Sequence, residues 1–469
     1  GVVLNAFGPS FLPLMGFVDG IGRGDEPTPE GRRPEPNEWR ERTEPAFGFA
    51  YDTMTRFEIV GPAHFRFNGP GVLERDEVEG DRRTMVWRTD APIRIANIVG
   101  GPLVEHVGES TSIWHLPEHH WNIEQMQLAL DGARRWYSEW FWPYPWQDLR
   151  LTEFPGLSAY AQGFGTNIVF SESIGFTARE QKDTDAPFMI TAHEAAHQWW
   201  GNILLPGKGP GGNILSEGLA HFSTAMLTGR IKGDGARANF LRGIERQYVE
   251  TRVPEDERPM VEVDGTRAGD TTLMYDKGGW VFWMLTRHMG RERALAGFRD
   301  FIGTFKDGPD FPLLQDFLAV MRTHAEDPEA FDDFAAMWFT NVVLPEYEVE
   351  VQSVSDADES GFRSVIVTVR NSGTGRMPVE VAVTNGEERW EDRDWTQREA
   401  YQEVRDTLLL GPDESSTVSF VCPFEPGAVV VDPDVQVLQF GRDRAEETID
   451  GATGAAVTAR DSTPPDAPD

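Results

Sequence analysis

The chain has 469 residues, 39% of them hydrophobic and 11% aromatic, so it can bury several packed cores and is not disordered as a whole. Its formal net charge of −34 argues against nucleic acid or an anionic membrane as a partner. Cys422 is the only cysteine, which excludes an internal disulfide and a thiolate metal site.

The first 120 residues contain short strand-like runs separated by glycine, proline and charged residues, and they predict an N-terminal β domain. The strand-like runs are 57–60, 84–87 and 93–96. Between them and the start of the chain, Gly24–Pro45 is rich in proline and charge and is expected to be an exposed loop.

Helical periodicity begins at about Ile123 and dominates residues 121–344, which we expect to form one domain. Apolar spacing predicts helices over 123–142, 278–288, 294–305 and 314–324, with strand-like runs at 149–151 and 167–170. From Pro345 the sequence changes to alternating apolar runs with turn residues between them, and this pattern predicts a β-sandwich over 345–443. Residues 444–469 are acidic and proline-containing and are expected to be a disordered tail. The predicted fold is therefore α+β and multidomain.

Two histidines four residues apart, His193 and His197, form an H-E-x-x-H pattern with Glu194. Positions i and i+4 share one helix face, so both imidazoles can bind one metal ion, and Glu194 can reach a water held by that ion. Asp185 and Pro187 predict that this helix begins just before the motif.

A carboxylate completes the pattern. Glu217 follows His197 by twenty residues and is expected in the first turn of a second helix that begins near Ser216. A carboxylate there can also serve the helix dipole alone. Two histidines and one carboxylate leave a fourth position open for water, as a catalytic zinc site requires.

Other histidines have simpler interpretations. His115, His119 and His120 precede a helix, and a surface loop is favoured over a second metal site. His221 lies four residues after Glu217, where it can support the metal ligands or simply pack in the core; both readings stay open.

Three linked motifs resemble the gluzincin metallopeptidases of the aminopeptidase-N and leukotriene-hydrolase type. They are the runs 193–202, 216–218 and 275–278, the last reading Tyr-Asp-Lys-Gly. Residues 141–145 and 430–433 are similar to further elements of that family. The resemblance implies a thermolysin-like, mostly helical zinc catalytic domain between the two β domains, with one Zn²⁺ per chain.

The same resemblance implies roles for single residues. His193, His197 and Glu217 would bind zinc, Glu194 would be the general base, and Tyr275 would donate its hydroxyl to the oxyanion of the tetrahedral intermediate. Without its Lys-Gly context Tyr275 would read as a core tyrosine.

The chain departs from the family where substrate is recognised. The family's glutamate that binds a free N-terminal amine is missing, and Gln162 and Gly163 stand near its place as the expected substrate-binding residues. An amide cannot pair with an ammonium group as a carboxylate does. Ser216 replaces the usual asparagine, and the spacing between His197 and Glu217 is one residue longer than usual.

The leading hypothesis is a zinc-dependent, aminopeptidase-like metallopeptidase that hydrolyses peptide bonds, although its departures from the family leave its specificity open. The alternative is a metal-binding sensing or interaction module of a membrane transport assembly, because the chain is similar to peptidase-like portions fused to ABC-type permeases. Hydrolysis of another electrophile, such as an epoxide, is a third reading. No segment has eighteen consecutive apolar residues, so the sequence predicts no membrane-spanning segment. The first residue is not methionine, and we expect a mature form or an excised portion of a longer protein. The similarity to permease fusions implies an extracytoplasmic or membrane-associated location, with a membrane-embedded partner or parent chain under the second hypothesis. The sequence does not indicate an oligomeric state.

Overall fold

The computed structural model describes residues 4–7, 45–46, 52–156, 159–179, 185–308, 310–391 and 395–449. Most of the loop predicted over Gly24–Pro45, and residues 450–469 of the predicted tail, lie outside these ranges. The chain divides into two compact units, residues 1–343 with 392–395 and residues 344–391 with 396–469. The second unit therefore begins one residue before the sandwich boundary expected at Pro345.

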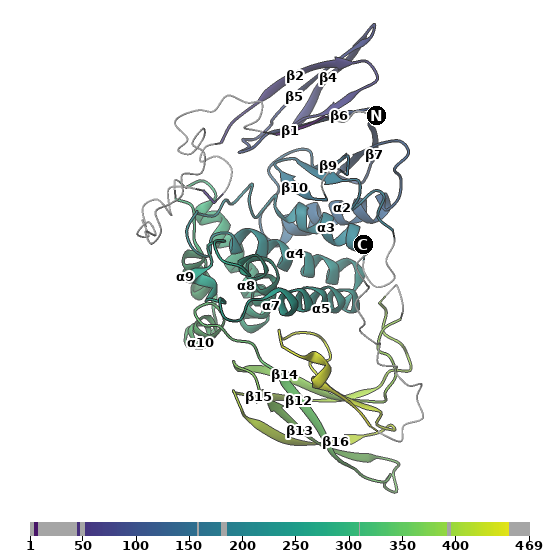
Figure 1. Cartoon of the computed structure of the whole chain (residues 1–469), viewed down its shortest axis with the longest axis vertical. Helices are drawn as coiled ribbons and strands as arrows, with labels where there is room; N and C mark the ends of the chain where they lie inside the picture. Colours follow the sequence, from purple (N-terminus) through teal and green to yellow (C-terminus); the bar gives the residue numbers. More distant parts are fainter. Residues whose placement is uncertain are drawn as a thin grey trace, which may run out of the picture. The chain divides into compact units, whose positions relative to one another are not determined.

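Two small antiparallel sheets open the first unit (Figure 1). One has the order β2-β5-β4 and the other β1-β6-β3. The strands are β1 (Leu4–Phe7), β2 (Arg56–Pro62), β3 (Arg66–Asn68), β4 (Val72–Glu79), β5 (Arg82–Arg88) and β6 (Asn97–Gly101). The strands predicted at 57–60 and 84–87 are confirmed. The one predicted at 93–96 is wrong, because Ile93 exchanges its two main-chain hydrogen bonds with Thr53 alone and the strand begins only at Asn97.

A mixed five-stranded sheet follows, in the order β10-β11-β9-β8-β7. Its strands are β7 (Val104–Val107), β8 (Ser112–His115), β9 (Arg150–Phe154), β10 (Ala161–Phe164) and β11 (Asn167–Ser171). β8, β9 and β11 run parallel, whereas β7 and β10 are antiparallel at the two edges. The domain boundary predicted at residue 120 is wrong, because this sheet combines strands from both sides of it. Strand pairing between distant segments leaves no local trace in sequence.

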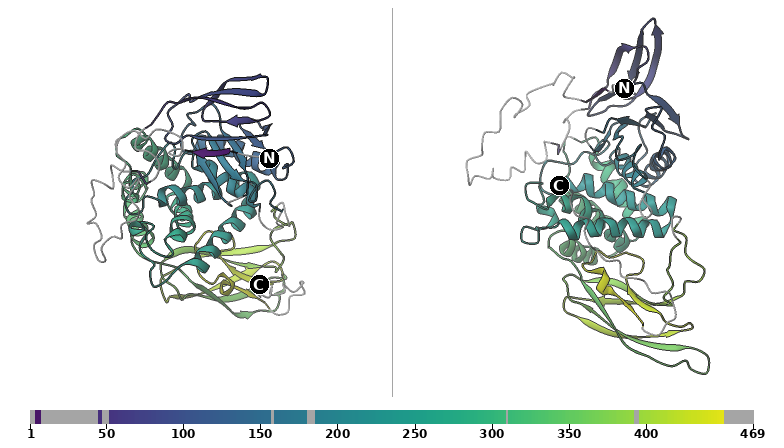
Figure 2. Two further views of the ribbon diagram at one scale, coloured as in Figure 1. Left: turned by 45° about the horizontal axis from the view of Figure 1, so that its top comes forward. Right: turned by 45° about the vertical axis from the view of Figure 1, so that its right-hand side comes forward.

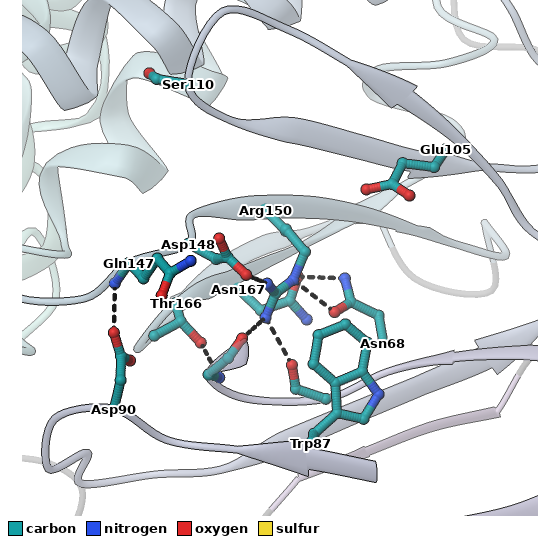
Figure 3. Close-up of polar contacts among 12 residues, drawn as sticks. Asn68, Trp87, Asp90, Glu105, Ser110, Gln147, Asp148, Arg150, Thr166 and Asn167 are labelled. Carbon is teal, nitrogen blue, oxygen red and sulfur yellow. Dashed lines mark hydrogen bonds and ion pairs between the residues drawn. The ribbon is translucent and has the colours of Figure 1, made fainter. Parts of the chain in front are cut away.

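Arg150 joins this sheet to the connection between β3 and β4 (Figure 3). Its Nε donates to Asn68 Oδ1 at 2.8 Å, and its Nη2 donates to the carbonyls of Gly69 and Gly71 at 2.8 and 2.6 Å. Asp148 accepts from Nη1 at 2.9 Å, so the buried guanidinium has its charge paired. Beside it lies a cleft of about 260 Å³, which none of the predicted site residues lines.

Helices make up the rest of the first unit. They are α2 (Ile123–Trp140), α3 (Ala186–Ala196), α4 (Ile214–Lys232), α5 (Asp234–Thr251), α6 (Asp270–Thr272), α7 (Gly278–Met289), α8 (Arg291–Phe305), α9 (Leu314–His324) and α10 (Pro328–Trp338). The four predicted helices are confirmed as α2, α7, α8 and α9. α4 packs against α3, α5 and α7 (Figures 1 and 2), so it is buried along most of its length. The carboxylate it carries is thereby held next to α3.

The second unit is a sandwich of two antiparallel sheets, β12-β13-β16 and β15-β14-β17-β18. Its strands are β12 (Tyr347–Val354), β13 (Arg363–Asn371), β14 (Met377–Thr384), β15 (Glu403–Leu410), β16 (Ser415–Cys422), β17 (Ala428–Val431) and β18 (Glu446–Thr448). In β13, Val365, Val367 and Val369 are buried and alternate with more exposed residues, as a two-layer core requires. The tail predicted from residue 444 is wrong over its first residues, since β18 pairs with β17.

Among the described residues, no helix is both long enough and apolar enough to span a lipid bilayer.

Candidate metal centre and catalytic site

Helix α3 carries the first histidine and ends at the second. The carboxylate of Asp185 accepts a hydrogen bond from the backbone N–H of Phe188 at 3.2 Å, and Pro187 lies in the first turn. The predicted helix start is therefore confirmed. His193 lies in the last turn and His197 is the C-cap residue.

Three donor atoms converge between α3 and the first turn of α4. His193 Nε2 lies 3.2 Å from His197 Nε2. Glu217 Oε2 lies 3.4 Å from the former nitrogen and 3.2 Å from the latter. Atoms at these separations can bind one ion at the distances of about 2.0–2.2 Å that zinc prefers. The structure thus brings together the three residues expected to bind metal.

The carboxylate is the clearest sign that this group suits a cation. Glu217 Oε2 is buried, and no described residue gives it a hydrogen bond. Burial acts to raise the pKa of Glu217, but the rings of His197 and His193 outweigh that effect and the pKa is lowered. A buried acceptor without a donor is uncommon in a folded protein, and a cation bound by both histidines would satisfy it.

The other ring nitrogen of His197 is held by the protein. Its Nδ1 lies 3.1 Å from the carbonyl oxygen of Trp200 and 3.3 Å from Ser216 Oγ, which itself donates to that carbonyl at 2.9 Å. A proton on Nδ1 leaves Nε2 free for metal. Ser216, noted in the sequence only as a departure, therefore helps to orient a metal ligand.

His193 is supported by a second histidine. His193 Nδ1 lies 2.9 Å from His221 Nδ1, and His221 Nε2 lies 3.7 Å from Asp276 Oδ1. Burial, with the neighbouring His193, lowers the pKa of His221 well below its usual value, which favours a neutral ring whose Nδ1 can accept a hydrogen bond from His193 Nδ1. The sequence left His221 open between support and packing; the hydrogen bond favours support. Asp276 was missed, although it lies within the tyrosine motif.

Glu194 is buried beside the metal ligands, and burial raises the pKa of its carboxyl group. The backbone of Gly163 hydrogen-bonds this carboxyl group, while the Gly163 carbonyl accepts from Asn202 Nδ2 at 3.0 Å. A Cβ atom at Gly163 would lie 2.5 Å from the Glu194 carbonyl oxygen and 3.0 Å from His197 Cβ. β10 can approach α3 this closely only because residue 163 is glycine.

Tyr275 lies on a π-helical turn, Leu273–Lys277, between α6 and α7. Its ring stacks on His193 with the centroids 5.9 Å apart. Burial raises the pKa of Tyr275, and so does the nearby charge of Glu217, which keeps the hydroxyl protonated. π-Helical turns are rare and often occur at functional sites, but nothing in the residue pattern indicates this one.

The lysine of the same motif anchors the turn. Lys277 Nζ lies 2.6 Å from Glu257 Oε1, and each side chain is 1% exposed. Glu257 is also bound by Arg252 and by the Tyr248 hydroxyl, at 2.6 and 2.7 Å. A fully buried and paired charge fixes the position of the turn that carries Tyr275.

Gln162 differs from the buried metal-site residues because its side chain is exposed. It lies on β10, an edge strand of the five-stranded sheet, and its neighbours Ala161 and Gly163 are half-buried. Gly163 contacts Glu194 directly. Among the described residues, the Gln162 side chain forms no hydrogen bond with the three metal-site residues.

Comparisons with known proteins agree with this arrangement. Residues 125–338, which include all three motif runs, match the family model described as the peptidase family M1 domain. Among solved structures, the chain is similar to Legionella pneumophila aminopeptidase A in complex with aspartic acid, with a TM-score of 0.55 and 15% sequence identity. The match covers 85% of this chain and 45% of that one, so the chain spans less than half the length of that aminopeptidase. At this identity the likeness supports the fold alone.

Residues 125–338 thus match a peptidase family M1 domain, and this match confirms the resemblance to the gluzincin metallopeptidases drawn from the sequence.

Proposed function

We propose that this chain is a zinc-dependent metallopeptidase related to aminopeptidases, with His193, His197 and Glu217 as its zinc ligands. The observation that carries the proposal is the convergence of their three donor atoms, with Glu217 Oε2 buried and without a hydrogen-bond donor. When bound, zinc would lower the pKa of a water molecule and polarise the carbonyl group of the substrate.

Glu194 is proposed as the general base. Its carboxyl group lies beside the ligands, is almost fully buried, and is oriented by the backbone of Gly163. In the proposed reaction it takes a proton from the attacking water and returns that proton to the leaving amine. A carboxylate whose pKa is raised by burial suits both transfers.

Tyr275 is proposed as the donor to the oxyanion. Its hydroxyl stays protonated because burial raises its pKa, and its ring is stacked against His193. As the substrate carbonyl becomes tetrahedral, its oxygen gains negative charge, and a neutral O–H donor in a site with little water stabilises that charge.

The outer edge of β10 is proposed as the surface that orients the peptide. An edge strand can pair with an extended substrate by main-chain hydrogen bonds, and β10 passes directly beside Glu194 and His197. Gln162, exposed on this strand, would then contact substrate side groups or its amino end through neutral hydrogen bonds. Without a carboxylate at this place, the chain should depend less on a free N-terminal amine.

A panel of peptides with free and with acetylated N-termini tests the proposal. We expect hydrolysis that chelators abolish and Zn²⁺ restores. Blocked peptides should be cleaved at rates within about tenfold of free ones, a difference of less than about 1.4 kcal/mol, because no carboxylate at residue 162 pairs with the free amine. A chain that holds one Zn²⁺ and cleaves neither set would contradict peptide hydrolysis. That result would favour the second hypothesis, a metal-binding module of a membrane transport assembly.

A further inference from the structure

A second group of possible metal ligands lies at the far end of the five-stranded sheet. It consists of His119, Glu153 and Glu172, each of which offers one ligand atom within 4.8 Å of the others. Glu153 lies on β9, Glu172 directly follows β11, and His119 follows β8. Because these three strands are parallel, their carboxyl ends meet at one edge of the sheet, which brings the three residues together.

Both carboxylates are held by backbone N–H groups. Glu153 Oε2 accepts from Leu116 N at 2.7 Å, and Glu172 Oε1 accepts from Gly156 N at 2.9 Å. The remaining oxygen of each faces the imidazole: His119 Nδ1 contacts Glu153 Oε1 and lies 3.7 Å from Glu172 Oε2. Each carboxylate thus presents one oxygen to a common point, and a backbone hydrogen bond holds its other oxygen. Carboxylates that bind metals are commonly held by hydrogen bonds in this way.

The charges of the group are not balanced by the protein. Glu153 is fully buried, Glu172 is 30% exposed, and neither forms an ion pair with lysine or arginine among the described residues. Burial raises the pKa of Glu153, and the one imidazole of the group can pair with only one of the two carboxylates. Bringing a carboxylate into the interior without full compensation costs several kcal/mol, which a divalent cation between the two glutamates would offset.

The surrounding backbone is built around this arrangement. A Cβ atom at residue 156 would lie 3.1 Å from Glu172 Oε1, so Gly156 allows the close approach. The Asn122 side chain donates to the carbonyls of Gly175 and Ala178 at 2.8 and 2.9 Å, which ties the loop after His119 to the turn after Glu172. The ligand atoms therefore come from three segments that are fixed relative to one another.

We propose that His119, Glu153 and Glu172 form a second site for a divalent cation of the class that binds nitrogen and oxygen, with Zn²⁺ as its probe. One imidazole and two carboxylates are ligands that Zn²⁺ accepts. The site closes the carboxyl end of the sheet by joining three loops, and it is independent of the proposed peptidase reaction, because none of its residues belongs to the group around Glu217. The sequence favoured a surface loop for His119, and this proposal instead makes it a metal ligand. His120 is exposed, as a surface loop residue would be.

Metal counting tests the site. The purified chain is loaded with Zn²⁺, dialysed, and analysed by mass spectrometry for bound metal. We expect two equivalents in the wild type, one in Glu172→Gln, one in His119→Asn, and one in Glu217→Gln, which removes the other site. Glu172 is partly exposed, so its amide variant should fold even if variants of the buried Glu153 do not.

Asp300→Asn is the matched control, because Asp300 lies 3.0 Å from His324 in an exposed pair with no second carboxylate; it should keep two equivalents. Zn²⁺ should also raise the melting temperature of Glu217→Gln, and this rise should vanish when Glu172→Gln is added. The proposal would be overturned if the wild type and Glu172→Gln each bound one equivalent of Zn²⁺ and Glu217→Gln bound none. His119, Glu153 and Glu172 would then form only hydrogen bonds and ion pairs with one another.

Discussion

Nδ1 of His193 lies 2.9 Å from Nδ1 of His221, so a side chain of α4 holds the metal-site histidine of α3 from behind. The lowered pKa of His221 favours a neutral ring that can accept a hydrogen bond from His193, and Asp276 lies on its other side. This support fixes the tautomer in which His193 presents Nε2 to the metal.

Replacing His221 by phenylalanine should therefore weaken zinc binding without abolishing it. Loss of a partner of this kind typically costs about 10–100-fold in metal affinity. Competition with a fluorescent zinc chelator measures the affinity of the site around Glu217, in a Glu172→Gln background so that only one site is counted. His288→Phe, a change at an exposed histidine, is the control and should leave the affinity unaltered. Equal affinities in both variants would mean that His221 only packs.

Tyr275→Phe should lower kcat and leave KM nearly unchanged, because the hydroxyl acts on charge that develops only in the transition state. Removing one oxyanion donor costs about 10²–10³-fold in kcat. Steady-state kinetics on the best peptide substrate provides the measurement. Tyr401→Phe removes a hydroxyl that binds Glu403 in the sandwich and should keep wild-type kcat. A fall in the affinity for zinc, with kcat retained at saturating metal, would argue against the catalytic role.

Gly163→Ala should damage catalysis through position alone. The added methyl group would meet the Glu194 carbonyl oxygen at 2.5 Å, so β10 or α3 must shift and Glu194 loses its alignment. A misplacement of about 1 Å can cost about 10²-fold in rate. Gly243→Ala on α5 meets nothing within 4 Å and should keep full activity, with slightly higher stability because alanine favours helices. Wild-type rates in Gly163→Ala would show that the close approach does not matter.

Lys277→Met should destabilise the fold more than its exposed counterpart. Removing one partner of a buried ion pair costs up to about 3–5 kcal/mol, and here Glu257 keeps its buried charge with Arg252 as the remaining cation. Lys306→Met breaks a pair whose Asp307 is 80% exposed and should cost less than about 1 kcal/mol. Urea unfolding compares the two free energies. Equal losses would mean that the Lys277–Glu257 pair contributes no more than a surface pair.

Local patterns were sufficient to predict much of this molecule. The i, i+4 spacing of His193 and His197, the N-cap at Asp185 and the apolar periodicity of α7 to α9 all depend on neighbours within a few residues, and the helices formed as expected. Glu217 lies in the first turn of α4 as predicted, although that helix begins at Ile214 rather than near Ser216.

What the sequence did not reveal depends on contacts between distant segments. The strand β15 begins Glu-Val-Arg-Asp and has no apolar alternation, so only its pairing with β14 makes it a strand. β7 and β8 belong to the five-stranded sheet only because β8 pairs in parallel with β9. The support of His193 by His221, and the grouping of His119 with Glu153 and Glu172, require residues that only the fold brings together.

Zinc content and peptide hydrolysis, measured together in the wild type and in Glu194→Gln, test whether this chain cleaves peptides at its zinc site. Both proteins should hold zinc at the site of His193, His197 and Glu217, and the variant should lose about 10²–10⁴-fold in kcat because it lacks only the base. Equal hydrolysis by the two proteins, or a wild type that holds zinc there and cleaves no peptide, would contradict peptide hydrolysis at this site.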